Sequence, residues 1–236
     1  MTATPNLGLP EDDSISHPIA TWGAPAAVFR GRSCQSLLQA RVARSFEEDE
    51  VLYEVGDTAR VVFFIRKGIV KTGTATGLGR EIIYHLRKDG EVVGELCLLD
   101  AVRRERAVAI EKTEAVLVDS DEIVTPLARQ PAMLGDVLTA LCRGLAEAHD
   151  QVNRMADDSV SQGLTKVLRD LALKLGQQSG KLVEITTYLT QEELSQMVGA
   201  RRERVSTALN VLRRRGLVQY TARGHLLLDV AALEER

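Results

Sequence analysis

The sequence of 236 residues is poor in the features that mark several large classes of protein. Aromatic residues make up only 4% of it, which disfavours the stacking platforms of single-strand RNA-binding proteins. The three cysteines, Cys34, Cys97 and Cys142, are far apart, and their odd number and spacing predict no disulfide framework. There is no signal peptide and no apolar run of membrane-spanning length. These absences predict a soluble cytoplasmic protein without a membrane partner.

Motifs of catalysis are missing as well. No nucleophile–base motif, metal-ligand spacing or glycine-rich nucleotide loop is present, so we expect no catalytic residue and no metal. The formal net charge of −3 at first argues against a nucleic-acid partner. The charge is uneven, however, because seven arginines and one glutamate lie between Gly199 and His225. A local basic patch, and not the total charge, is the electrostatic signature of nucleic-acid binding.

Residues 189–215 have the pattern of a helix-turn-helix. Thr190 followed three residues later by Glu193 predicts a capping box at the start of the first helix. That helix has an apolar face made by Leu189, Leu194, Met197 and Val198. Gly199 falls where the helix ends and the chain enters a left-handed turn. The second helix is predicted to run from about Arg201 to Arg215.

The second helix is amphipathic. Its apolar residues recur at i, i+3, i+4 and i+7, and they are Val205, Ala208, Leu209 and Leu212. The residues predicted to face away from this stripe, and so toward DNA, are Arg202, Glu203, Ser206, Thr207 and Asn210. Arginine bonds guanine and glutamate accepts from the amino group of cytosine, so Arg202 and Glu203 are candidate base readers. Arg201 and Arg204 are better placed as phosphate contacts.

Two short apolar runs follow, Leu217–Tyr220 and His225–Leu228, around a turn that contains Arg223. This pattern predicts a β-hairpin, which after a recognition helix forms the wing of a winged helix, with Arg223 near phosphate. The alternative is a helix-turn-helix that binds no DNA, in which the arginines at 213–215 are a solvated helix end.

The chain divides into four segments. Residues 1–28 are predicted to be a flexible arm, residues 29–130 a small antiparallel β-barrel or jelly roll, residues 131–157 a dimerisation helix, and residues 158–236 the winged helix domain. The fold class is therefore α+β. A short helix is predicted at Ser36–Ala43, and a longer one at about Ser159–Leu175, followed by a break at Gly176–Gly180. The candidate barrel strands are Val51–Val55, Val61–Ile65, Ile69–Thr74, Glu81–Leu86 and Ala115–Val118.

Residues 131–157 have a heptad pattern. Its positions are Leu134, Leu138, Leu141, Leu145, Ala148, Val152 and Met155. A narrow stripe sustained for about three heptads predicts a helix that pairs with its copy in a homodimer. The alternative is a single amphipathic helix that lies on the barrel.

A barrel, a long helix and a winged helix in this order resemble the CRP/FNR family of bacterial transcription regulators. The resemblance covers about residues 35–230 and rests on several motifs. They are Gly56-Asp57 with Ala59, Gly68-Ile69-Val70, Val93–Leu99 in the place of the phosphate-binding cassette, and Gly199–Ser206 in the place of the recognition-helix signature. The resemblance implies that Arg202, Glu203 and Ser206 contact bases in a half-site similar to TGTGA. Thr207 stands where most members have a second arginine, and Arg201 replaces a capping Ser or Thr.

The resemblance also implies an effector pocket between the barrel and the long helix. Glu95, flanked by Gly94 and Leu96, matches the glutamate that bonds the ribose of cyclic AMP, although it also fits a structural role in a barrel turn. The phosphate-binding pair of cyclic-AMP receptors falls on Glu105 and Arg106, or on Arg106 and Ala107 after a shift of one residue. The polar pair that reads adenine falls on Ala148 and His149. Either alignment leaves one phosphate-binding position without a suitable side chain, so ordinary cyclic-AMP binding is not expected.

Arg103, Arg104 and Arg106 crowd this region and would suit a ligand of higher charge, such as cyclic di-GMP. The alternative is a surface loop of alternating charge. We therefore expect an altered nucleotide effector, ahead of no effector and of cyclic AMP, with Arg104, Arg106 and His149 as candidate contacts. A haem on His85 or Cys97 is not expected, because such residues usually belong to a core.

The sequence thus predicts a dimeric regulator that binds double-stranded DNA at a palindromic promoter site and acts with RNA polymerase. The rival hypotheses are a signalling module whose winged helix binds protein, and an enzyme.

Overall fold

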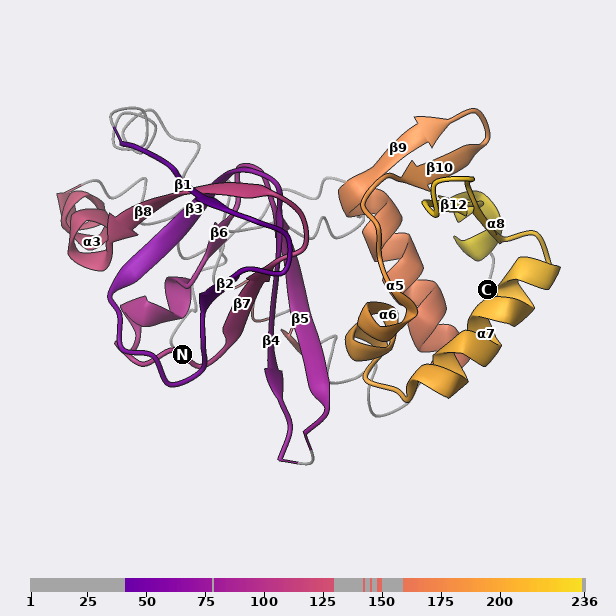
Figure 1. The fold of residues 1–236 in the computed structure, drawn as a ribbon, viewed down its shortest axis with the longest axis horizontal. Coiled ribbons are helices and arrows are strands. Elements are labelled where there is room, and N and C mark those ends of the chain that lie inside the picture. The colour runs from indigo at the N-terminus through magenta and orange to yellow at the C-terminus, as the bar shows by residue number, and fades with distance from the viewer. Residues whose placement is uncertain are drawn as a thin grey trace, which may run out of the picture.

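The computed structural model describes residues 41–77, 79–129, 142, 145, 148, 149 and 159–234. Figure 1 shows two lobes, an N-terminal domain built mainly of strands and a C-terminal domain in which helices pack beside a small sheet. All strand pairs are antiparallel, and the α+β class predicted from the sequence is confirmed.

The N-terminal domain contains eight strands, one short 3-10 helix and one α-helix within its described part. These elements are β1 (Arg44–Phe46), β2 (Val51–Tyr53), β3 (Val61–Lys67), β4 (Ile69–Ala75), β5 (Glu81–Lys88), β6 (Val92–Val93), η1 (Glu95–Leu98), β7 (Arg106–Ala109), β8 (Thr113–Asp119) and α3 (Ser120–Arg129). The strands form two four-stranded sheets, with the orders β1-β8-β3-β6 and β2-β7-β4-β5. We call this pair of sheets the roll.

Much of the interior of the roll is apolar because alternate residues of each strand point inward. Side chains from both sheets meet in one core, and they include Phe46, Phe63, Tyr53, Val70, Ala107 and Ala109. A smaller cluster around Val116 and Ile123 joins the first sheet to α3. Short strands separated by glycine and charged turns therefore predicted this architecture correctly, although β1, β6 and β7 were not foreseen.

The C-terminal domain contains four helices and a four-stranded sheet within its described part. Its elements are α5 (Val160–Leu175), β9 (Gly176–Ser179), β10 (Leu182–Ile185), α6 (Gln191–Val198), α7 (Arg202–Arg214), β11 (Val218–Tyr220), β12 (Leu226–Leu228) and α8 (Val230–Glu234). The strand order is β11-β12-β10-β9, so the wing hairpin is joined to an earlier hairpin. The buried leucines of α5, α6, α7 and β12 form the core of this domain, among them Leu164, Leu168, Leu194, Leu209, Leu212 and Leu228.

The structure corrects two local predictions. The predicted break at 176–180 is the strand β9 and its turn, because the chain passes from α5 directly into a hairpin that pairs Gly176 with Ile185. A Cβ on Gly176 would lie 2.2 Å from the carbonyl oxygen of Ala172, so the glycine permits this close approach. Residues 41–43, the end of the helix predicted at 36–43, are not helical. The rest of that helix lies outside the described residues.

Most of the predicted dimerisation helix also lies outside the described residues, including Leu134, Leu138, Leu141, Val152 and Met155. Leu145 and Ala148 are helical and exposed, and Leu145 is 59% exposed in the single chain. Within the described part of the chain, no helix is both long enough and apolar enough to cross a membrane.

The two domains are in direct contact. Ile69, Ile83, Leu86 and Ile110 of the roll belong to the same apolar cluster as the C-terminal core. Figure 1 shows the β4–β5 hairpin lying between the two lobes, beside α6. The orientation of the C-terminal domain is therefore coupled to the outer surface of β4 and β5.

Candidate nucleic-acid interface and effector region

The helix α6 begins and ends as its sequence predicts. The Thr190 hydroxyl accepts from the Glu193 amide at 3.1 Å, and the Glu193 carboxylate accepts from the Thr190 amide at 2.9 Å. This reciprocal pair is the predicted capping box. Gly199 ends the helix with φ 72°, in the left-handed region that favours glycine. The turn sets the angle at which α7 leaves α6.

The helix α7 buries the predicted stripe and exposes the predicted surface. Val205, Ala208, Leu209 and Leu212 are buried. The exposed residues on its other side include Arg202, Glu203, Arg204, Thr207 and Asn210, whereas Ser206 is half-buried. Arg201 is the N-cap residue and its side chain makes no capping hydrogen bond, so it extends into solvent at the end of the helix. A cationic helix start of this kind suits the phosphates that border a major groove.

The wing is the hairpin of β11 and β12. Val218 pairs with Leu228 and Tyr220 with Leu226, and Arg223 is exposed at the turn between the strands. The Arg213 guanidinium stacks over the Tyr220 ring at 5.3 Å from its centroid, so one arginine of the 213–215 run joins the helix to the wing. A hollow of about 560 Å³ separates the wing from the starts of α6 and α7, with Tyr188, Glu192 and Arg202 in its lining.

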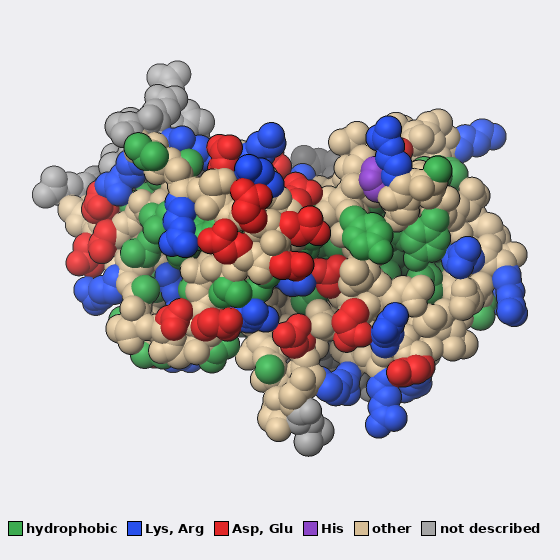
Figure 2. Space-filling view, in the orientation of Figure 1, with side chains coloured by type: hydrophobic (Ala, Val, Ile, Leu, Met, Phe, Trp, Pro, Cys, Tyr) green, Lys and Arg blue, Asp and Glu red, His purple; other side chains and the backbone are tan. Residues whose placement is uncertain are grey.

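Figure 2 shows how charge is divided over the visible face. Lys and Arg side chains lie along the edge of the molecule that carries α7, whereas Asp and Glu side chains lie mainly over the roll, together with further Lys and Arg. The division agrees with the local basic patch read from the sequence.

In the roll, the turn after β6 packs against a buried side chain of the roll itself. Gly94 has φ 83° and precedes η1. A Cβ there would lie 2.6 Å from Nη1 of Arg103, whose guanidinium donates to the Gly94 carbonyl at 2.8 Å. Arg103 is only 3% exposed and stacks over the Tyr53 ring at 4.2 Å. Its guanidinium therefore supports the turn from inside the roll.

Two carboxylates meet in this interior. Glu105 is buried and accepts from the Tyr53 hydroxyl at 3.0 Å. Burial, followed by the charge of Glu95, raises the pKa of Glu105 to about 7, although the hydrogen bond from Tyr53 and the charge of Arg87 oppose the shift. Burial likewise raises the pKa of Tyr53, which keeps its hydroxyl a donor. An anion that approaches Glu105 at neutral pH therefore meets a carboxylate that is partly protonated.

Glu95 has one engaged oxygen and one free oxygen. Its Oε1 lies 3.3 Å from Nη2 of Arg87, whereas its Oε2 is buried and has no hydrogen-bond partner among the described residues. A buried carboxylate oxygen without a partner is costly, so this atom is a natural acceptor for a ligand hydroxyl.

The other predicted effector contacts are not drawn together. Arg104 is exposed and pairs with Asp100, and Leu96 and His149 are also exposed. Arg106 bonds to Glu54 at 3.0 Å and to Glu81 at 3.3 Å, on the side of β7 that faces the C-terminal domain. Among the described residues, no ion pair joins Glu95 to Arg104 or Arg106.

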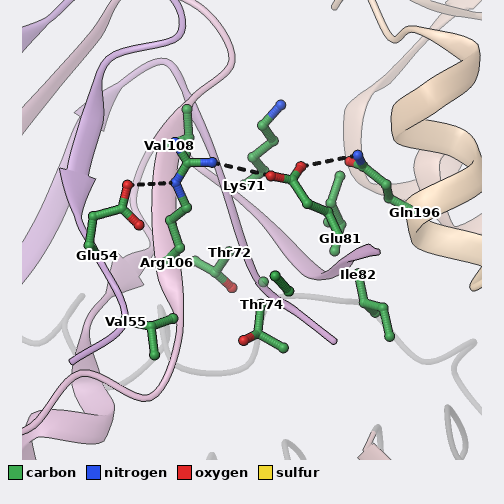
Figure 3. A pocket seen from close by; sticks show the side chains of 13 residues that line it. Glu54, Val55, Lys71, Thr72, Thr74, Glu81, Ile82, Arg106, Val108 and Gln196 are labelled. Atoms are coloured by element: carbon green, nitrogen blue, oxygen red, sulfur yellow. Dashed lines mark hydrogen bonds and ion pairs between the residues drawn. The ribbon is translucent and has the colours of Figure 1, made fainter. Parts of the chain in front are cut away.

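Figure 3 shows where Arg106 points. Dashed lines run from Glu54 to Arg106, from Arg106 to Glu81, and from Glu81 to Gln196 of α6, so a polar chain crosses from the roll to the helix-turn-helix. It borders a cavity of about 210 Å³ between β4, β5, β7 and α6. No pattern in the sequence indicated this cavity.

Further polar contacts hold the two domains together. Lys71 Nζ of β4 lies 2.8 Å from Glu193 Oε1, and Arg80 donates to the Gly199 carbonyl at 2.8 Å. Burial would raise the pKa of Glu193, but its bonds with Lys71 and Thr190 hold it below the ordinary value. Glu193 thus caps α6 and fixes that helix on the roll.

Cys97 lies in the protein interior, as expected, whereas His85 keeps part of its surface exposed. Burial, with the charges of Arg87 and Lys174, lowers the pKa of His85 to about 3. Cys97 is 5% exposed in the cluster beside α3. No group of three or more metal-ligating side chains occurs among the residues that the structure describes.

Comparisons with known proteins agree with this architecture. The cyclic nucleotide-binding domain family matches residues 43–129, and the Crp-like helix-turn-helix domain family matches residues 162–236. The chain is 28% identical to a CRP-like cAMP-activated global transcriptional regulator of Mycobacterium tuberculosis, over 90% of this chain and 97% of that protein.

Two solved structures share the fold. A CooA variant from Carboxydothermus hydrogenoformans has a TM-score of 0.72 at 19% identity, over 92% of this chain and 97% of that chain. The cyclic di-GMP-responsive global regulator CLP from Xanthomonas campestris has a TM-score of 0.69 at 20% identity, over 82% of this chain and 96% of that chain.

A winged helix-turn-helix that follows a cyclic-nucleotide-binding domain defines a DNA-binding transcription regulator and not an enzyme. The chain belongs to the CRP/FNR family of these regulators.

Proposed function

We propose that this protein works as a homodimer that binds a palindromic promoter site and is controlled by a nucleotide effector other than cyclic AMP. Two copies of α7 enter successive major grooves about one helical turn apart. The side chains proposed to face the bases are Arg202, Glu203, Ser206 and Thr207. Those proposed to face phosphates are Arg201, Arg204 and Arg223. RNA polymerase is the partner through which DNA binding alters transcription.

The observation that carries the DNA-binding proposal is the exposed surface of α7. The N-cap and the first turn hold Arg201, Arg202, Glu203 and Arg204, which are all exposed, and none of the three arginines forms an ion pair among the described residues. Unpaired guanidinium groups at a helix start are free to replace the cations that cover DNA phosphates. Steep weakening of duplex binding with added salt tests this directly, and its absence would favour a winged helix that binds protein.

The exposure of Leu145 supports the dimer. A leucine that is 59% exposed in the single chain, at a predicted heptad position, leaves much of its apolar surface uncovered. A second copy of the helix would cover it. Sedimentation of wild type against Leu145→Lys is the test, with Glu114→Gln on an exposed position of β8 as the matched control. A wild-type monomer at micromolar concentration would contradict the dimer.

The free oxygen of Glu95 supports an effector in the roll. Gly94, Glu95 and Leu96 form one wall of the proposed site, and Oε2 of Glu95 accepts a sugar hydroxyl there. Arg104 and His149 complete the proposed contact set. Arg106, which faces α6, joins it only by leaving both Glu54 and Glu81. Release of Arg106 would then loosen the chain of bonds that ends on α6, which couples the effector to the DNA-reading helix.

Glu105 argues against cyclic AMP as that effector. Its carboxyl group, and not a guanidinium, stands inside the roll near Glu95, and the fraction that is ionised at neutral pH repels the single phosphate of cyclic AMP. A cyclic dinucleotide carries two phosphates and so offers more phosphate oxygens to the exposed arginines. CLP, a structural neighbour, responds to cyclic di-GMP, which makes this molecule the first candidate.

A second candidate function is regulation without any ligand. The bonds of Tyr53 to Glu105 and of Arg87 to Glu95 satisfy much of the interior of the roll without a ligand. Such a protein would bind DNA constitutively.

One experiment separates these proposals. The full-length protein is titrated with cyclic AMP, cyclic GMP and cyclic di-GMP while its binding to a palindromic duplex is followed. We expect cyclic di-GMP to change the duplex affinity, Glu95→Gln to weaken that response, and the control Glu114→Gln to retain it. Unchanged affinity with all three nucleotides would favour the ligand-independent regulator, and a response to cyclic AMP alone would overturn the effector assignment.

A further inference from the structure

The DNA-facing row of α7 has a short, methyl-bearing side chain at its centre. Glu203, Thr207, Asn210 and Arg214 follow one another at intervals of four, three and four residues and are all exposed. This row lies on the opposite side of the helix from the buried stripe of Val205, Ala208, Leu209 and Leu212. Thr207 is therefore aimed at whatever α7 lies against.

The hydroxyl of Thr207 is turned toward its own helix. Oγ1 donates to the carbonyl oxygen of Glu203, one turn earlier, at 2.8 Å. A threonine hydroxyl has one proton to donate, and here it is used in the hydrogen bond to the backbone. The γ-methyl group is the part of the side chain left to face outward. Thr207 consequently presents an apolar contact and not a hydrogen-bond donor.

The position of Thr207 also controls how closely the helix approaches. A side chain this short touches a base only when the backbone of α7 lies near the floor of the groove. In the major groove, thymine alone among the four bases presents a methyl group, on C5. A threonine methyl group buried in the major groove therefore favours contact with the C5 methyl group of thymine.

We propose that Thr207 selects thymine at one base pair of each half-site, through contact between its γ-methyl group and the thymine C5 methyl. This inference rests on the proposed DNA-binding function and assigns part of its sequence preference. The neighbouring Glu203, whose carboxylate is free among the described residues, reads an adjacent base by accepting a hydrogen bond. The two residues thus read different base pairs by different chemistry, one polar and one apolar.

The test removes each methyl group separately. A preferred duplex is first selected from a random pool by the full-length protein, and each thymine of one half-site is then replaced by deoxyuridine. This replacement deletes only the C5 methyl and preserves base pairing. Wild type is compared with Thr207→Ser, which keeps the hydroxyl and loses the methyl, and with Thr207→Val, which keeps the methyl and loses the hydroxyl. Thermal unfolding of each protein confirms that the exposed substitutions leave the fold intact.

We expect one thymine per half-site at which deoxyuridine weakens wild-type binding about fourfold, the effect of uncovering roughly one buried methyl-sized group. Thr207→Val retains this loss at the same thymine. Thr207→Ser binds the two duplexes equally at that position but keeps every other base preference. If wild type binds a specific duplex but no thymine shows a methyl effect that depends on Thr207, the inference alone is overturned. Failure of wild type to prefer any duplex overturns the DNA-binding proposal and the inference with it.

Discussion

Lys174 of α5 and Glu91, which precedes β6, form an ion pair between the two domains that is shielded from water. Nζ lies 2.9 Å from Oε2, and the two side chains are 3% and 4% exposed. The backbone carbonyl of Lys174 also accepts from Lys88 Nζ at 2.6 Å. A charged pair so deeply buried requires both partners, because either one alone would leave an uncompensated charge in a medium of low polarity.

Replacing Lys174 with methionine should therefore destabilise the protein by about 3–5 kcal/mol, the usual cost of breaking a buried pair. The double variant Lys174→Met, Glu91→Leu removes both charges and should recover most of the loss. Urea unfolding of the single and double variants is the measurement. Equal stability of the two variants would mean that the pair contributes through packing and not through charge.

Glu105 gives the protein a stability that depends on pH. Its pKa is raised from 4.5 to about 7 by burial and by Glu95, so between these values the native state holds a proton that the unfolded state has released. Stability contributed by this proton is present at low pH and is lost as pH rises toward 7. The difference corresponds to an upper limit of about 3.5 kcal/mol, at about 1.4 kcal/mol for each pKa unit.

The variant Glu105→Gln cannot ionise and still accepts from Tyr53. We expect it to unfold at higher urea concentration than wild type at pH 8, and to differ little from wild type at pH 5. Midpoints measured at both values give the comparison. If both proteins show the same change with pH, the titrating group is elsewhere.

The helix-turn-helix was predictable because its signals are local. The capping box, the glycine turn and the stripe of α7 all lie within residues 190–212, and every element agrees with the structure. The domain contacts were not predictable, because they join residues far apart in the sequence. One signal was present: Lys174 follows Leu171 by three residues and so occupies the apolar stripe of α5, where a charge must find a buried partner.

In the candidate effector region, prediction from the sequence is limited in a different way. The sequence allowed two alignments of the phosphate-binding pair, which differ by one residue. In a strand, one residue decides which side of the sheet a side chain faces. The structure has Glu105 bonded to Tyr53 inside the roll, whereas Arg106 is bonded to Glu54 and Glu81 toward α6. Residue types alone could not assign these two faces, since both neighbours are charged.

Arg201 places a cation at the N-terminal end of α7 and leaves that helix without a capping bond. A serine at the N-cap would accept from a free amide of the first turn, which the Arg201 side chain does not do. We expect Arg201→Ser to stabilise the protein by about 1 kcal/mol and to weaken duplex binding. The slope of log affinity against log salt should become shallower by about 0.9 for each phosphate that the variant no longer neutralises. Stabilisation with an unchanged salt slope would show that Arg201 does not touch phosphate.

Glu203 and Arg204 provide a matched pair of substitutions, because they are adjacent, exposed and charged but lie on different sides of α7. Glu203 lies on the outward row, so Glu203→Ala should remove the preference for one base pair, by about 1–3 kcal/mol of discrimination. Arg204 lies beside that row, where we propose that it meets phosphates, so Arg204→Ala should weaken all duplexes alike and leave their ranking unchanged. Competition binding of each variant to duplexes that differ at single positions measures both effects. A Glu203→Ala protein with unaltered site preference would remove Glu203 from the base-reading set, and the specificity of α7 would then depend on Arg202 and Thr207.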